Sequence, residues 1–285
     1  MDSWLIAAAL NKFLLLLGTA SVLGAWLLHQ LRGHWSRALL LWLRVCSGVL
    51  LLACVLILPI QAGALAEAGW SGMFDRLMLS IVWQTHWGDS TALRLAGSLL
   101  AVYAVWFTTS RALLLAIASV LLVAAFALGG HLVEQPIWLR TLLLVHVAIG
   151  LAWLGCLFPF YLLVREQPSV KQARLLKRFG ELATVPLVLL LIVGVILVLA
   201  VIATPEAMIS TGYGQLLSTK LTLTLVLLAL GAWHKFVAVP RLAGEAMAID
   251  LKAIRVTVAI ETLAGWILLA VLALMTTVVG PAHHG

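Results

Sequence analysis

The sequence predicts an all-α integral membrane protein, a bundle of eight transmembrane helices that forms one domain over residues 1–285. Hydrophobic residues make up 64% of the chain and charged residues only 10%, against roughly 25% charged residues in soluble domains. The mean hydropathy is +1.13, and apolar runs recur at the length of about 20 residues that a helix needs to cross a bilayer. No stretch is left for a separate soluble domain.

Eight apolar runs define the predicted spans in order. They cover residues 5–28, 38–60, 90–107, 112–130, 138–164, 181–203, 218–236 and 256–279. The first is expected to be retained, because no basic segment precedes it and no small-residue cleavage site follows it. Pro59 marks the predicted end of the second span, a tight turn at 108–111 separates the third from the fourth, and Pro136 precedes the fifth.

The long connection between the second and third spans, residues 61–89, is amphipathic and rich in tryptophan. Trp70, Trp83 and Trp87 lie in it, and tryptophan favours the boundary between membrane and water. We therefore expect an interfacial or re-entrant helix over residues 73–85.

Basic residues predict the orientation of the bundle. They are concentrated in alternate connections, so the net charge of +7 indicates membrane topology rather than nucleic-acid binding. Because Lys and Arg prefer the cytoplasmic side, these connections are predicted to be cytoplasmic and both termini periplasmic. The residues are Arg32, Arg37, Arg111, Arg165, Lys171, Arg174, Lys177, Arg178, Lys235, Arg241, Lys252 and Arg255.

The three cysteines, Cys46, Cys54 and Cys156, all lie inside apolar runs. Their odd number and the absence of a CxxC pair argue against a disulfide framework. Small packing residues are the favoured interpretation, with a soft metal-relay role as the alternative.

Histidines supply the candidate metal ligands. The predicted orientation places His29, His34 and His234 on the cytoplasmic side, as ordinary solvated residues. It places His86, His131, His146, His283 and His284 towards the outer side. His146 lies about 10 Å inside the fifth span at the helical rise, and a polar residue at such a depth is a functional candidate. Imidazole suits copper and zinc, so the five outer histidines are the predicted metal ligands.

Intramembrane charges form a second group. Each is costly in hydrocarbon unless it is paired or reaches the interface. Glu261 and Arg44 both fall in the predicted cytoplasmic half, and we expect them to form a structural ion pair rather than a proton relay. The other members are Lys12, Arg94, Glu181 and Lys220.

Several segments together resemble the CopD family of bacterial inner-membrane copper proteins. They are Gly130-His131, His146, Trp153-Leu154-Gly155 with Pro159, Arg178-Phe179 with Gly194, Tyr213-Gly214-Gln215-Leu216-Leu217 with Lys220, Leu228-Ala229-Leu230-Gly231-Ala232 with Pro240, and Arg255 with Glu261 and Pro281. Residues 170–280 are most like the core of the family. The chain departs from it at Cys156, where a second glycine is common, and at Trp233-His234, where an asparagine is frequent.

The resemblance implies a multi-pass protein of the bacterial cell inner membrane that moves copper, as Cu(I) or Cu(II), across that membrane or receives it at the outer face. Uptake from the periplasm towards the cytoplasm is the expected direction, because the outer histidines would capture copper there. His131 and His146 would be the principal ligands, His86 a third, and His283 and His284 further candidates. No copper-binding domain is fused to the tail, so a CopC-like carrier would be a separate chain. The expected surroundings are the lipid bilayer, with no nucleic acid.

Two alternatives stay open. Intramembrane histidines also serve as axial haem ligands, which would make the protein a membrane electron-transfer protein. A non-transporting receptor would instead use residues 61–89 to dock a periplasmic copper carrier. An enzyme is not expected, because the sequence contains neither HExxH nor GxSxG and no P-loop that would drive export.

Overall fold

The computed structural model describes residues 3–66, 68–128, 136–165, 170–201, 207–241 and 247–278, which are helical almost throughout and contain no strand. The elements are α1 (Ser3–Arg32), α2 (Arg37–Ala66), the 3-10 helix η1 (Gly69–Phe74), α3 (Arg76–Trp83), α4 (His86–Trp106), α5 (Arg111–Ala124), α6 (Ile137–Val164), α7 (Val170–Val201), α8 (Ala207–Ser210), α9 (Gly212–Trp233), the π-helix η3 (His234–Ala238), α10 (Val239–Arg241) and α11 (Met247–Thr277).

All eight predicted spans correspond to helices, but six helical stretches in the described residues are long and apolar enough to cross a membrane. These are α1, α2, α6, most of α7, α9 with its extension to Arg241, and most of α11. The predicted third span is α4, whose polar residues lower its hydropathy. The predicted fourth is α5, which has only 14 residues, or about 21 Å of helix. Six candidate spans are therefore established, and a total of eight stays a prediction.

Two predicted boundaries were wrong. Pro59 does not end the second helix, because α2 continues through it to Ala66; neighbouring helices and local adjustment make such prolines tolerable in membranes. The expected helix over 73–85 is split into η1 and α3. Asp75 separates them, since its Oδ1 accepts hydrogen bonds from the backbone N–H groups of Leu77 at 2.8 Å and Met78 at 3.1 Å and so caps α3.

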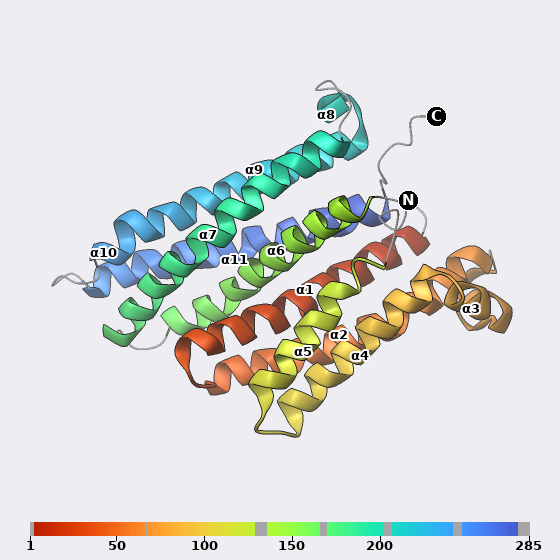
Figure 1. Cartoon of the computed structure of the whole chain (residues 1–285), viewed down its shortest axis with the longest axis horizontal. Helices are drawn as coiled ribbons and strands as arrows, with labels where there is room; N and C mark the ends of the chain where they lie inside the picture. The colour runs from red at the N-terminus through yellow and green to blue at the C-terminus, as the bar shows by residue number, and fades with distance from the viewer. Residues whose placement is uncertain are drawn as a thin grey trace.

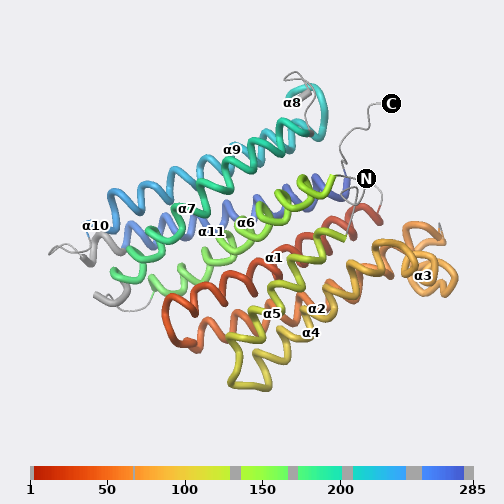
Figure 2. Tube along the Cα trace, viewed as in Figure 1, coloured from red at the N-terminus to blue at the C-terminus, as the bar shows by residue number. Residues whose placement is uncertain are grey.

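Helix α1 lies at the centre of the bundle (Figure 1). It packs on α2, α6, α11 and α5. Helices α2, α4 and α5 form one side, and α7 and α9 lie on the other side against α6 and α11. The trace in Figure 2 shows the same order, with α4 and α7 separated by the rest of the bundle.

The closest helix crossing joins α1 and α6 at Gly24 and Gly155. A Cβ atom on Gly24 would overlap the backbone of Gly155, and one on Gly155 would overlap the Ala20 carbonyl. Cys156, a buried free thiol, donates from Sγ to the Gly24 carbonyl oxygen at 3.5 Å. The Trp153-Leu154-Gly155 motif therefore has a structural role, because it lets two backbones touch.

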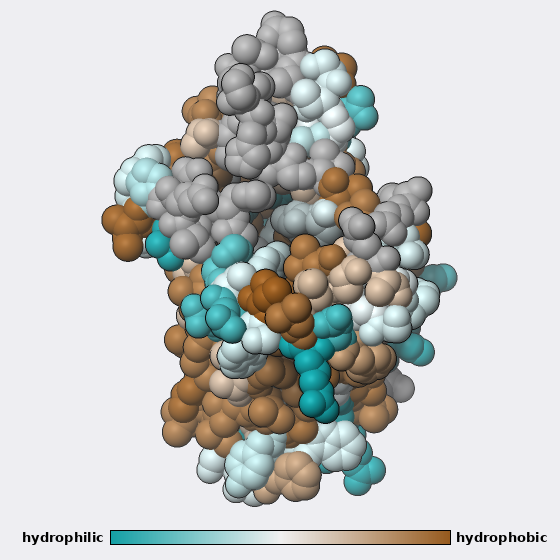
Figure 3. Space-filling model, turned by 90° about the vertical axis from the view of Figure 1, so that its right-hand side faces the viewer, coloured by the Kyte–Doolittle hydropathy of each residue, from teal (hydrophilic) through white to brown (hydrophobic). Residues whose placement is uncertain are grey.

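The described helix ends that flank the basic connections gather at one end of the bundle, and the described ends of the chain, Ser3 and Val278, lie at the other (Figure 1). At the basic end Arg255 ties α11 to α6, since its Nε and Nη2 atoms donate to the Val164 carbonyl oxygen at 3.2 and 3.1 Å. Figure 3 looks onto the opposite end and shows hydrophilic residues set among hydrophobic surface. The arrangement agrees with the charge asymmetry on which the predicted orientation depends.

Candidate functional site

His146 is a half-buried imidazole at the contact between α6 and α7. It lies nine residues after the first residue of α6, or about 13 Å along the helix. Its Nδ1 atom is 3.2 Å from the Leu190 carbonyl oxygen. A carbonyl oxygen only accepts, so Nδ1 must carry the hydrogen of this bond. In the neutral ring, Nε2 then holds the lone pair.

Gly194 makes room for this ring. A Cβ atom at Gly194 would lie 3.2 Å from Cε1 of His146, which is tighter than nearly all real contacts. Leu190 and Gly194 are one turn apart on α7, so a single patch of that helix both holds and accommodates the imidazole. A histidine that donates one N–H to a carbonyl and presents the other nitrogen is oriented as metal-ligating histidines usually are.

Lys220 is the charged neighbour of this site. It lies on α9, and its ammonium group acts electrostatically on His146. A positive charge there opposes a second cation at the imidazole.

The other predicted ligands are not assembled with His146 in the described part of the chain. His86 is exposed at the start of α4, and its ring stacks on that of Trp87 with 6.0 Å between centroids. Helix α4 lies across the bundle from α7 (Figure 1). His131, His283 and His284 lie outside the described residues. Among those that are described, no group of three His, Cys, Asp or Glu residues is placed to hold a metal ion.

Sequence reasoning missed a buried polar cluster at the basic end of the bundle. His234 was predicted to be solvated and Glu261 to pair with Arg44, and both predictions were wrong. Nδ1 of His234 is 3.4 Å from Oε1 of Glu261, whose residue is only 4% exposed. The Arg44 guanidinium instead lies over the Trp106 ring, 5.1 Å from its centroid.

Hydrogen bonds connect His234 to Thr257. The Thr257 hydroxyl lies within hydrogen-bond distance of the Ala253 and Ile254 carbonyl oxygens, each at 3.0 Å. When it donates to one of them, its oxygen, 2.6 Å from Nε2 of His234, accepts a hydrogen bond from the ring. On the other side of the ring, Nδ1 faces the Glu261 carboxyl group.

The backbone at this cluster is unusual. His234 begins the π-helix η3, a conformation that is rare and frequent at functional sites. The next residue, Lys235, donates from Nζ to the Thr184 hydroxyl on α7. The sequence did contain a signal for this pair, because His234 lies near the end of one predicted span and Glu261 lies in the next, in the same predicted cytoplasmic half.

Fold and site define a multi-pass helical membrane protein with an imidazole presented inside the bundle. Residues 173–275 match the family CopD, described as Copper resistance protein D. This match over residues 173–275 confirms the resemblance to the CopD family seen in the sequence. No curated protein matches the chain. No solved structure matches it either.

The family match covers α7 from Ala173 through α11 almost to its end. It contains Leu190 and Gly194, which hold His146, and it contains His234 and Glu261. His146 itself lies on α6, before the matched segment. The match thus supports a copper-resistance membrane protein and includes the helix that orients the candidate ligand.

Proposed function

We propose that the protein is a copper-binding protein of the bacterial inner membrane that takes up copper from the periplasm and moves it towards the cytoplasm. The observation that carries the proposal is the geometry of His146. Its Nδ1 is engaged by Leu190, inside the segment that matches CopD, and its Nε2 is left for a metal. Imidazole nitrogen is a suitable ligand for copper.

His146 would need further ligands, since a metal ion takes several. The proposed set adds His131 together with His86, His283 and His284. His131 lies in the connection that leads into α6, and the two tail histidines follow α11. His86 begins α4, at the same end of the bundle as the described chain ends (Figure 1). It would serve as an entry ligand there rather than as a direct neighbour of His146.

The charge distribution supports the proposed direction of transport. Because basic connections favour the cytoplasm, the proposed ligands would lie at the periplasmic face, where they could receive copper. The sequence contains no nucleotide-binding motif to drive export. A separate CopC-like carrier would deliver copper to this face.

The test is copper binding by the purified full chain with and without His146. His146→Ala is expected to weaken copper binding at least tenfold, because it removes the imidazole that Leu190 orients. His34→Ala is the matched control, since His34 is exposed and bonds only to the nearby Arg32 carbonyl oxygen. Equal affinities in the two variants would overturn the assignment. An optical spectrum of the same sample tests for haem.

Transport is tested separately in reconstituted vesicles loaded with a copper chelator. Copper entry that depends on His146 supports uptake. Stoichiometric binding without copper entry would contradict transport and favour the receptor function.

Binding is also expected to depend on pH. A protonated imidazole cannot ligate a metal, so copper affinity should fall as the solution is acidified. Isothermal titration at a series of pH values measures this. Without His146, protons should compete less with copper for the site. The copper affinity of the His146→Ala variant should therefore depend less on pH.

The charge on Lys220 provides a further prediction. Lys220→Gln should raise copper affinity severalfold, because it removes a cation that acts on His146 and leaves a neutral side chain of similar reach. Lys252→Gln is the control, because Lys252 is exposed near the start of α11, at the basic end of the bundle, and it should leave the affinity unchanged. Weaker binding in Lys220→Gln would instead show that the lysine helps to hold the metal or its anion.

A further inference from the structure

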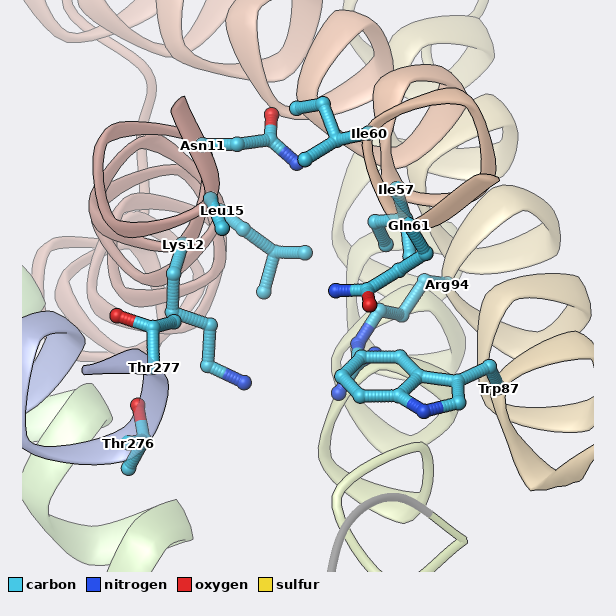
Figure 4. Close-up of a pocket in the computed structure, with 11 residues that line it drawn as sticks. Asn11, Lys12, Leu15, Ile57, Ile60, Gln61, Trp87, Arg94, Thr276 and Thr277 are labelled. Atoms are coloured by element: carbon cyan, nitrogen blue, oxygen red, sulfur yellow. The ribbon is translucent and has the colours of Figure 1, made fainter. Parts of the chain in front are cut away.

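A pocket at the end of the bundle opposite the basic connections contains two cationic side chains. It lies between α1, α2, α4 and the end of α11 and is partly open to the outside. Lys12, Gln61 and Arg94 extend into it from three different helices (Figure 4). Trp87 lines one side, and Thr276 and Thr277 line another.

The two cations lie close together. Lys12 Nζ and Arg94 Cζ are 5.6 and 5.3 Å from the centroid of the same Phe126 ring. The Arg94 charge acts on Lys12. Arg94 is 4% exposed, and its Nε atom is buried without a hydrogen-bond partner. Aromatic contact offsets only part of the cost of a buried cation.

No carboxylate among the described residues neutralises this pair. Glu261 bonds to His234, and Asp75 caps α3. Asp89 and Glu181 are exposed and form no ion pair with either cation. Two adjacent positive charges in an apolar bundle are unfavourable unless an anion joins them.

We propose that this pocket binds a phosphate-type oxyanion between Lys12 and Arg94. The guanidinium group offers planar paired donors that match phosphate oxygens, and the ammonium group adds a compact charge. The Gln61 amide can donate from a third side. Trp87 favours the depth of lipid headgroups, so the oxyanion is free phosphate or the phosphate of an anionic lipid. The pocket repels a bare copper cation and is distinct from His146.

The first experiment titrates inorganic phosphate into the purified full chain in zwitterionic detergent, with chloride holding the ionic strength constant. Saturable binding is expected, weakened at least tenfold in Arg94→Gln and in Lys12→Gln. Arg140→Gln is the matched control, because that guanidinium lies near the same end but donates to the Ala127 carbonyl oxygen at 2.9 Å. Gln61→Leu provides a milder variant should either cation prove necessary for folding.

The second experiment identifies the source of the oxyanion. The chain is reconstituted in nanodiscs of phosphatidylcholine with or without phosphatidylglycerol, and retained lipid is measured by native mass spectrometry. Retention of phosphatidylglycerol that is lost in Arg94→Gln, but kept in Arg140→Gln, assigns the site to a lipid. If phosphate binding is instead lost in Arg94→Gln and kept in Arg140→Gln, the site is assigned to the free ion.

Three results would overturn the proposal. One is the absence of saturable binding in both experiments, and another is binding that Arg94→Gln and Lys12→Gln leave unchanged. The third is phosphate binding that appears only after Asp2→Asn and Glu134→Gln are combined. Those carboxylates lie outside the described residues, and that result would show that the chain supplies its own anion. Copper binding at His146 is measured independently, so the two proposals fail separately.

Discussion

Leucine at Gly155 is expected to prevent the protein from folding. A Cβ atom there would already overlap the Ala20 carbonyl group, and the three nearest atoms are all backbone atoms of α1. Backbone cannot yield as a flexible side chain does, so the two helices would have to separate. The cost should exceed the about 1–3 kcal/mol of ordinary overpacking, because α1 also contacts α2 and α11 and its displacement would disturb the whole bundle.

The measurement is the yield of monodisperse protein and its melting temperature in detergent. Gly231→Leu is the matched control, since this glycine also lies inside a helix but has open space around its Cβ position. A Gly155→Leu protein with the yield and melting temperature of the control would contradict the crossing between α1 and α6.

The helices were predictable from the sequence because their signal is local. Apolar runs and basic connections occur along the chain itself, and every predicted span has a helix. The errors at Pro59 and Asp75 arose where neighbouring helices or a side-chain cap decided the boundary. Helix α4 is missing from the six candidate spans for a similar reason, since polar residues such as Arg94 lower its hydropathy but face a pocket inside the bundle.

The candidate site was less predictable because it depends on contacts between distant segments. The sequence singled out His146 by its depth, but it could not show that Leu190 takes up one ring nitrogen. It assigned Glu261 to Arg44 because both fall in the cytoplasmic half. Depth restricts the partners of a buried charge, whereas the direction in which each side chain leaves its helix selects among them.

Removal of His234 alone is expected to destabilise the protein by about 3–5 kcal/mol, the cost of leaving one partner of a buried pair uncompensated. His234→Leu leaves the Glu261 carboxyl group, in a residue that is 4% exposed, without its imidazole. The double variant His234→Leu with Glu261→Leu should recover most of this loss, because it removes both polar groups and keeps the volume filled. Melting temperatures of the wild type, His234→Leu, Glu261→Leu and the double variant form the double-mutant cycle.

Glu261→Gln tests whether the pair carries charge. The amide can donate to Nδ1 while Nε2 still donates to Thr257, so the hydrogen bonds around a neutral His234 survive. Near-normal stability at neutral pH would then indicate a neutral pair, whereas a loss as large as that of Glu261→Leu would show that the carboxylate balances an imidazolium. If His234→Leu melts at the wild-type temperature, the pair contributes nothing and the assignment of the cluster is wrong. Copper affinity should stay unchanged throughout, because His146 is held by Leu190 on α7 and does not bond to this pair.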